Sequence, residues 1–410
     1  MPNIASILND RLNPTQARLL NLAGTVSSQH GLALYLVGGT VRDAMLGRQT
    51  IDLDLSVVSA DPGFASVLAR GLNGQVVASS LFGTSKLRIG DMVIDLAMAR
   101  SESYAYPGAL PSVVPGSIDE DLARRDFSVN AMAISINPDT WGDLLDPFGG
   151  REDLQRRLIK VLHPESFVDD ATRILRAVRY AGRLGFQLEA STDQFMRRDI
   201  SYLDTIKGDR VRHELVRIFH EERAESILRL TQDAGILSAI HPAFYLQEST
   251  LKGFRELNAE RTSDSDLLFL SLLTYAALVS DRPALIRRLN LDSRLAGVVR
   301  DTGSVKDSYD RLDNPHLKRS QLHELLNPFI ASAIKGCAIA VDRPVVARHL
   351  NLFLSELRHV RPLLNGDDLI AMGVPEGPII GKLLKEIMAS RLDGLIATEV
   401  DEKNFVNRNI

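Results

Sequence analysis

The spacing of apolar residues divides the chain into two regimes. From about Leu32 to Asp146, short β-prone runs alternate with Gly, Pro and Asp, which is typical of a sheet with a few helices. The runs that predict strands are LALYLVG, TIDLDLSVV, GQVVASS, SKLRIG, MVIDLAMA and AMAISI.

From about Gly150 onward, strand patterns nearly vanish and apolar residues recur every three or four positions, which predicts helices. The clearest helical segments are DDATRILRAVRYAGRLGF, DRVRHELVRIFH and ESILRLTQDAGIL. We therefore expect a head that combines a sheet with helices, followed by a long all-helical body.

Length and composition limit the number of domains and the compartment that we expect for this chain. At roughly 150 residues per domain, 410 residues suggest several domains with a sizeable core. Cys337 is the only cysteine, which excludes an intrachain disulfide framework and fits a reducing compartment. The N-terminal segment MPNIASILNDRLNPTQ lacks the apolar core of a signal peptide, so we expect a cytoplasmic protein.

Neither membrane insertion nor coating of nucleic acid through bulk charge is expected. The apolar run Leu267 to Ser280 is shorter than the about 20 residues of a membrane helix, and it predicts a buried helix instead. The net charge of −4 argues against binding through total charge, although a local basic surface stays possible.

Two aspartates in the run TIDLDLSV are the first candidate for chemistry. Alternate side chains of a strand share a face, so Asp52 and Asp54 point one way while Ile51, Leu53 and Leu55 point into the core. Paired carboxylates repel unless a cation lies between them, and oxygen ligands at this spacing suit Mg²⁺. An exposed strand edge with two solvated aspartates is the alternative.

Asp95, in the run MVIDLAMAR, is a third candidate carboxylate. We expect it on a neighbouring strand beside the first two, where three carboxylates would suit two-metal nucleotidyl transfer. A strand-end residue without a ligand role is the alternative.

The pair Gly38-Gly39 follows a predicted strand and precedes a predicted helix. Glycines there allow close approach of a ligand, and the helix N-terminus offers N-H groups to an anion. Arg42 could then reach a phosphate. A plain strand-to-helix connection explains the same residues.

Four motifs, taken together, resemble those of the class II tRNA nucleotidyltransferase and bacterial poly(A) polymerase family in order and spacing. A C-terminal segment, LNGDDLIAMGVPEGPIIGKLLKEIMASRLDG, is also similar to that family. The four motifs are LVGGTVRDAMLGRQTIDLDLSV, EDLARRDFSVNAMAI, DPFGGREDL and DDATRILRAVRYAGRLGF.

The resemblance implies an α+β head of the polymerase-beta-like kind, with a small mixed sheet and helices, followed by an all-α neck, body and tail. The implied domains are the catalytic head at 1–148, the neck with a base-reading helix at 149–225, the body at 226–355, and a tRNA-binding tail at 356–410.

The resemblance also implies an activity. Such an enzyme adds C, C and A to the 3′ end of tRNA from CTP and ATP, without a nucleic-acid template, with Mg²⁺ as cofactor and pyrophosphate as product. Its partners would be the tRNA acceptor end and the two nucleotides, and no protein partner is implied.

Matching the family motifs residue by residue assigns the site. Asp52 and Asp54 match the metal-binding pair, and Asp95 stands where the family often carries Glu. The nucleotide-binding residues implied are Gly38, Gly39 and Arg42 for the triphosphate, Arg125, Asp126 and Asn130 for sugar and phosphates, and Asp170 and Arg173 for the base, with Arg176 and Arg179 beyond them.

Residue chemistry agrees with the assignment of a base-reading pair. Asp170 and Arg173 are three apart in a helical pattern and are expected on one face. The carboxylate can accept from the exocyclic amine of C or A, and the guanidinium can donate to a ring nitrogen or carbonyl. U and G lack that pattern. A solvated, salt-bridged helix face that Arg176, Arg179 and Arg183 continue is the alternative.

Two further segments bear on the activity. Ser101 to Ile118 stands where the family has a flexible loop associated with adding the final A, which counts against CC-only addition, although the segment carries no Lys or Arg. GVPEGPIIG predicts a turn between two helices whose N-H groups could bind an RNA phosphate, or a plain packing turn.

Full CCA addition is the leading hypothesis from sequence. CC-adding, A-adding and poly(A) polymerase activities share the same chemistry and stay open. A tRNA-binding protein without catalysis is disfavoured by the intact candidate ligands, and a small-molecule nucleotidyltransferase would need neither the base-reading segment nor the long helical body.

Overall fold

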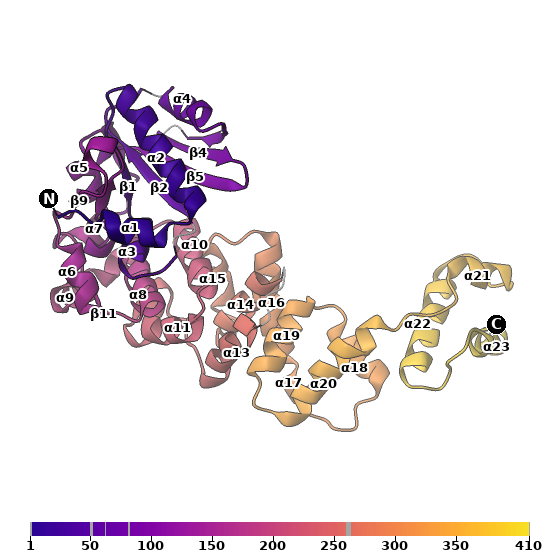
Figure 1. Ribbon diagram of the computed structural model, residues 1–410. Helices are drawn as coiled ribbons and strands as arrows, with labels where there is room; N and C mark the ends of the chain where they lie inside the picture. The colour runs from indigo at the N-terminus through magenta and orange to yellow at the C-terminus, as the bar shows by residue number, and fades with distance from the viewer. Residues whose placement is uncertain (1, 50–51, 62, 81–82, 260–263, 410) are drawn as a thin grey trace. The chain divides into compact units, whose positions relative to one another are not determined.

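A computed structural model describes residues 2–49, 52–61, 63–80, 83–259 and 264–409 of the chain (Figure 1). Ile51, which the sequence pattern directs to the core, lies outside these residues. The chain divides into two compact units, Met1–Ile206 and Lys207–Ile410.

A mixed sheet forms the centre of the first unit. Its strand order is β3-β4-β5-β2-β1-β8-β9, and all neighbours are antiparallel except β2 and β5, which are parallel. The strands are β1 (Leu34–Val37), β2 (Leu53–Val57), β3 (Gln75–Ser79), β4 (Thr84–Ile89), β5 (Met92–Met98), β8 (Ala133–Ser135) and β9 (Leu144–Leu145). The six predicted strands are therefore confirmed.

Helices cover the sheet and continue beyond it along the chain. Helix α4 packs against β3 and β4, and α2 packs against α4 (Figure 1). The helices of this unit are α1 (Ala5–Arg11), α2 (Pro14–Gln29), α3 (Gly39–Met45), α4 (Phe64–Gly71), α5 (Ile118–Ala123), α6 (Gly150–Arg156), α7 (Ser166–Asp169), α8 (Thr172–Leu184) and α9 (Ala190–Asp199), with short 3-10 turns η1 (Ser128–Asn130), η2 (Pro138–Thr140) and η3 (Ile200–Thr205).

Burial along β2 follows the alternation that the sequence predicts. Leu53, Leu55 and Val57 are each 1% exposed, while Asp52 is exposed and Asp54 is half-buried. Because alternate strand residues face opposite sides of a sheet, one side of β2 belongs to the hydrophobic core and the other carries the carboxylates.

The segment between β5 and α5 is an ordered hairpin. Strands β6 (Arg100–Ser103) and β7 (Ser112–Pro115) pair in antiparallel fashion from Arg100 opposite Pro115 to Ser103 opposite Ser112. The predicted loop of Ser101 to Ile118 thus contains regular structure. Past Gly150, the described strands are the two-residue pair β10 (Leu158–Ile159) and β11 (Gln187–Leu188).

The second unit is helical throughout its described residues, as predicted. Its helices are α10 (Gly208–Phe219), α11 (Ala224–Asp233), α12 (Ile236–Ile240), α13 (Glu248–Ala259), α14 (Ser265–Leu273), α15 (Arg282–Arg288), α16 (Ser293–Asp307), α17 (Tyr309–Leu312), α18 (Arg319–Leu326), α19 (Ala331–Ala340), α20 (Pro344–Ser355), η4 (Leu357–His359), α21 (Gly366–Ala371), α22 (Pro378–Leu392) and α23 (Glu399–Asn409).

The apolar run at Leu267 is a buried helix over only part of its predicted length. Helix α14 ends at Leu273, where the hydroxyl of Thr274 donates to the carbonyl of Leu270 at 2.8 Å. Beyond it, Leu278 and Val279 are 67% and 59% exposed, so the predicted helix is wrong for its second half. Among the described helices, none is both long enough and apolar enough to cross a membrane.

The C-terminal segment has a small core of its own. Helices α21 and α22 flank a turn in which Gly373 and Gly377 have φ of +95° and +139°, as the Gly-rich pattern predicts. Its core consists of Leu364, Leu369, Val374, Leu383, Ile387 and Val406.

Candidate functional site

The predicted carboxylates lie on two neighbouring strands. Asp54 on β2 is the register partner of Asp95 on β5, so the two side chains stand side by side on the same face of the sheet. Asp52 immediately precedes β2. Thr40 in α3 ties this strand to the Gly38-Gly39 turn, because its hydroxyl donates to the carbonyl of Asp52 at 3.0 Å and accepts from the N-H of Asp54 at 3.3 Å.

The electrostatics at Asp54 suit a bound cation. Burial raises the pKa of Asp54, and the nearby charges of Asp95 and Asp52 raise it further, while Arg125 and Lys86 oppose them. Carboxylates held together against their repulsion are relieved by a divalent cation, and Mg²⁺ typically takes one or two of them. The donor set of Asp52 and Asp54 therefore fits Mg²⁺.

Asp95 is already engaged by a cation of the chain. Lys86 Nζ lies 2.9 Å from one carboxylate oxygen of Asp95 and 3.1 Å from the other. Within the part of the chain that the structure describes, no group of three or more His, Cys, Asp or Glu is placed to hold a metal ion.

The Gly38-Gly39 turn lies against Arg125. Gly38 has a φ of +68°, and a Cβ added there would stand 2.6 Å from Arg125 Nη1. A side chain at this position would thus meet both an unfavourable backbone conformation and the guanidinium. The turn begins α3, as predicted, and it brings a cation close to its backbone.

Arg42 is directed into the protein. Its side chain is 3% exposed, pairs with Asp43 at 2.9 Å and donates to the amide oxygen of Asn130 at 2.6 Å. Burial alone would lower the pKa of Arg42, but the bond and charge of Asp43 outweigh burial and raise it. In this arrangement Arg42 orients Asn130.

Asp121 forms ion pairs with both arginines that follow α5, Arg124 and Arg125. It accepts from Arg124 at 2.7 Å and from Arg125 at 3.0 Å. Burial would raise the pKa of Asp121, but the two guanidinium groups together hold it below its usual value. Arg125 Nε is buried without a hydrogen-bond partner among the described residues.

Asp126 and Asn130 lie together, as the sequence predicts. The amide of Asn130 donates to one carboxylate oxygen of Asp126 at 2.9 Å, and Arg176 Nε donates to the other at 2.9 Å. Burial would raise the pKa of Asp126, but Arg176 and the bond from Asn130 hold it low. Between them, Phe127 and Val129 are fully buried.

The ring of Tyr180 contacts three of the arginines that the sequence assigns to nucleotide binding. The guanidinium carbons of Arg179, Arg42 and Arg176 lie 4.8, 5.4 and 5.6 Å from the centre of its ring. These distances are in the range of cation-π attraction. Phe127 meets the edge of the same ring, with 5.8 Å between the ring centres.

The placement of Asp170 differs from the sequence prediction. Asp170 is extended, with φ −143° and ψ 97°, and it lies between α7 and α8, so the expectation that it shares a helix face with Arg173 is wrong. Its carboxylate accepts from the backbone N-H and the hydroxyl of Thr172 at 3.0 and 2.7 Å. This local bond competes with helix formation and delays the start of α8 to Thr172.

Arg173 is buried and held at three points. It donates to the hydroxyl of Ser166 at 2.7 Å, to the carbonyl of Ser166 at 3.3 Å and to the carbonyl of Arg124 at 2.8 Å. Its guanidinium therefore connects α7, α8 and the segment after α5.

A small cavity of about 180 Å³ opens beside Arg173. Its lining combines the β6-β7 hairpin with the segments of the predicted nucleotide site. The lining residues are Ser101, Glu102, Tyr104, Glu120, Ala123, Arg124, His163, Asp169 and Arg173.

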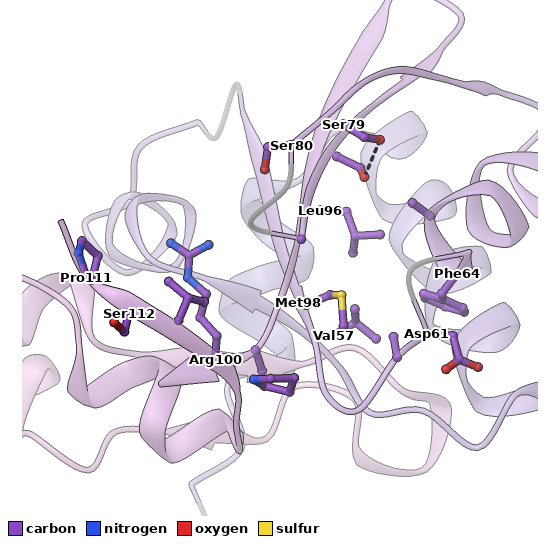
Figure 2. Close-up of a pocket in the computed structure, with 17 residues that line it drawn as sticks. Val57, Asp61, Phe64, Ser79, Ser80, Leu96, Met98, Arg100, Pro111 and Ser112 are labelled. Atoms are coloured by element: carbon purple, nitrogen blue, oxygen red, sulfur yellow. Dashed lines mark hydrogen bonds between the residues drawn. The ribbon is translucent and has the colours of Figure 1, made fainter. Parts of the chain in front are cut away.

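A cavity of about 850 Å³ lies on the other face of the sheet (Figure 2). Val57, Leu96 and Met98 line it from the strands and Phe64 lines it from α4. These strand residues alternate with Asp54 and Asp95, so the cavity is separated from the carboxylates by the sheet.

Sequence reasoning missed four residues of this neighbourhood: Lys86, Glu102, Asp121 and Tyr180. Asp121 carried a signal, since it precedes Arg124 and Arg125 by three and four positions, which is the spacing of ion pairs on a helix. Tyr180 carried a weaker one, four positions after Arg176. Lys86 reaches Asp95 across strands, and Glu102 accepts from Arg124 at 3.1 Å across 22 positions; neither carried a signal.

Family models match two stretches of the chain. A model described as the poly(A) polymerase head domain matches residues 34–160. A second model, described as the probable RNA- and SrmB-binding site of polymerase A, matches residues 185–246.

Known relatives match nearly the whole chain. The A-adding tRNA nucleotidyltransferase of Geobacter sulfurreducens is 33% identical over 99% of this chain and 48% of its own length, so the chain spans about half of that relative. The A-adding enzyme of Halalkalibacterium halodurans is 30% identical over 98% of this chain and 95% of its own. The CC-adding enzyme of Deinococcus radiodurans is 30% identical over 90% of this chain and 87% of its own length.

Solved structures agree with these relatives. An apo form of a CCA-adding enzyme superposes with a TM-score of 0.86 at 28% identity, covering 100% of this chain and 99% of that one. The Thermotoga maritima CCA-adding enzyme complexed with tRNA gives a TM-score of 0.78 at 28% identity, with 100% and 98% covered. The predicted polymerase-beta-like head followed by helices is thereby confirmed.

Proposed function

Because the chain belongs to the tRNA nucleotidyltransferase family, we propose that it transfers a nucleotide from a triphosphate to the 3′-hydroxyl of tRNA without a nucleic-acid template. The addition we assign first is the terminal A on tRNA that ends in CC. The placement of Asp52 and Asp54 beside the Gly38-Gly39 turn, to which Thr40 ties them, carries the assignment of the chemistry. The relatives in Geobacter and Halalkalibacterium, both named A-adding, favour the terminal step.

The transfer requires a divalent cation at the carboxylates, and we assign Asp52 and Asp54 to hold Mg²⁺. When bound, Mg²⁺ lowers the pKa of the attacking hydroxyl and offsets charge on the leaving pyrophosphate. The backbone of Asp54 is positioned by its strand and by the hydroxyl of Thr40.

The triphosphate would lie along the Gly38-Gly39 turn. Because Gly38 has no side chain, the guanidinium of Arg125 lies close over the turn, where it would meet a phosphate. Arg176 and Arg42 hold Asp126 and Asn130 in place, and we assign this fixed pair to the ribose. We assign Arg42 and Arg176 to position these two residues, together with Arg179 through Tyr180.

Base choice is assigned to Asp170 and Arg173. The carboxylate accepts from the exocyclic amine that A and C share, and the guanidinium donates to the neighbouring ring atom. In the structure Arg173 donates to Ser166 and Arg124. Base recognition would replace one of these bonds with a bond to the nucleotide. The guanidinium of Arg173 is already buried and oriented before the nucleotide binds, which lowers the cost of this exchange.

The remaining chain would bind tRNA. We keep the division into a head at 1–148, a neck at 149–225, a body at 226–355 and a tail at 356–410 as part of this proposal. The turn between α21 and α22, with its two glycines of positive φ, is the segment of the tail that we assign to an RNA phosphate.

Full CCA addition from CTP and ATP, the activity that sequence analysis places first, is the second candidate. The likeness to a CCA-adding enzyme over 100% of this chain favours it.

One extension assay tests both candidates. The full chain with Mg²⁺ is given tRNA that lacks the last one or the last three nucleotides, with ATP, CTP or both. Terminal A addition predicts one A on the CC-ended tRNA and no growth of the tRNA that lacks all three. Growth by C, C and A would replace it with the second candidate.

The matched control is the variant Asp52→Asn/Asp54→Asn, which keeps side-chain size but removes both charges. It should lose at least about 1,000-fold in rate while retaining its fold. Wild-type rates in this variant would refute the proposed chemistry, whichever nucleotide is added.

A further inference from the structure

Three charged residues form a row across three adjacent strands. Lys86 on β4 is the register partner of Asp95 on β5, and Asp95 is the register partner of Asp54 on β2. Leu87, Leu96 and Leu55 next to them are buried on the other face. A lysine thus stands two strands from the carboxylate that we assign to Mg²⁺, on the same face of the sheet.

The lysine engages both oxygens of Asp95. Its Nζ lies at 2.9 and 3.1 Å from them, and the side chains of Lys86 and Asp95 are 55% and 51% exposed. A pair at this exposure gains little stability, since solvent screens its attraction. The Lys86–Asp95 pair lies beside Asp54, which the charges of Asp95 and Asp52 already disfavour as a carboxylate. The pair can therefore affect how a cation binds there even though it adds little stability.

We propose that Lys86 is a positioning residue that holds Asp95 out of the metal site, so that the divalent cation is bound by Asp52 and Asp54 alone. The inference rests on the proposed function for the identity of the metal pair. With two carboxylates, the cation depends on the nucleotide phosphates to complete its ligands, as is usual for Mg²⁺. With Asp95 released, three carboxylates would bind the free cation more tightly.

The test measures the Kd of Mn²⁺ for the full chain without nucleotide. Either calorimetry or the electron paramagnetic resonance signal of free Mn²⁺ gives this value. Lys86→Met should tighten binding about tenfold, because affinity rises with the charge count of the ligands. Lys86→Arg should bind as wild type, because a guanidinium also pairs with a carboxylate.

A double-mutant cycle separates this role from simple removal of a positive charge. Adding Lys86→Met to Asp95→Asn should leave Mn²⁺ affinity as it is in Asp95→Asn alone. Equal tightening in both backgrounds, or no tightening in Lys86→Met, would overturn the proposal. The matched control is Arg88→Met, because Arg88 lies on the same face of β4 but opposite Val93; this variant should bind Mn²⁺ as wild type.

Failure of the inference can be told from failure of the proposed function. Asp52→Asn/Asp54→Asn should abolish Mn²⁺ binding in every background. If Mn²⁺ binding survives that change, the assigned metal pair is wrong; if it is lost but Lys86→Met has no effect, only the role of Lys86 is wrong. Fluorescence of Trp141, the only tryptophan of the chain, checks that each variant folds.

Discussion

Arg173 Nη2 donates to the backbone carbonyl of Arg124 at 2.8 Å, across 49 positions of sequence. Arg124 in turn pairs with Asp121, which also holds Arg125 beside the Gly38-Gly39 turn. The residue assigned to the base is thereby linked through one backbone group and one carboxylate to the residue assigned to the triphosphate.

Arg173→Ala should reduce base discrimination more than tRNA affinity. The change removes the donor to the base and leaves the carbonyl of Arg124 and the hydroxyl of Ser166 without their partner. We expect the preference for ATP over GTP and UTP to fall by about 10- to 100-fold, since a good bidentate base contact is worth about 1–3 kcal/mol. Relative kcat/KM for the four nucleotides and the Kd for tRNA measure this.

Ser166→Ala is the control for that prediction. It removes one orienting bond but keeps the guanidinium, so it should cost less discrimination than Arg173→Ala. An Arg173→Ala enzyme that still prefers ATP as strongly as wild type, but binds tRNA poorly, would show that Arg173 acts on RNA instead.

Tyr180 should matter through its ring and not through its hydroxyl. Three guanidinium groups lie within 5.6 Å of the ring centre, and each attraction to a desolvated ring is worth about 0.5–2 kcal/mol. Tyr180→Leu should therefore raise KM for ATP about tenfold, while Tyr180→Phe should stay within about twofold of wild type. Steady-state kinetics on CC-ended tRNA compare them, and equal KM values in the two variants would contradict the role of the ring.

Asp121 should stabilise the first unit in a pH-dependent way. Its folded pKa is depressed, so its contribution is complete above the unfolded value of about 4 and is lost as pH falls through the folded pKa. Asp121→Asn should lower the free energy of unfolding by about 2 kcal/mol at pH 7, the scale of hydrogen bonds to charged groups, and this cost should shrink below about pH 4. Denaturant unfolding followed by Trp141 measures it.

Asp119→Asn is the matched control, because Asp119 is an exposed carboxylate on the same helix. It should change stability by less than about 0.5 kcal/mol at any pH. A cost of Asp121→Asn that stays constant down to pH 3 would argue against ion pairing as its source.

Sequence predicted local features well where local physics decides them. The alternation in β2 fixed which side chains face the core, and it placed Asp52 and Asp54 on the other side. The helical spacing after Gly150 likewise predicted α8, α10 and α11. Each of these depends on periodicity within one element.

Features that depend on partners from elsewhere were not predictable. Lys86 meets Asp95 only because β4 and β5 pair in one register, and a shift of one residue would turn the lysine to the other face. Asp170 stands at the start of a helical pattern, yet its bonds to Thr172 keep it extended, and α8 begins only at Thr172. In the sequence, Tyr180 occupies an ordinary position of an amphipathic helix. Its contact with Arg42 of α3 exists only in the folded chain.

The central claim is that this protein, and not a nucleic-acid template, selects the nucleotide added to tRNA. Single-turnover rates with ATP, CTP, GTP and UTP on tRNA that ends in CC test it most directly. We predict one added A, faster than any other nucleotide by at least about 100-fold. Similar rates for all four nucleotides, or no extension at all, would contradict the claim.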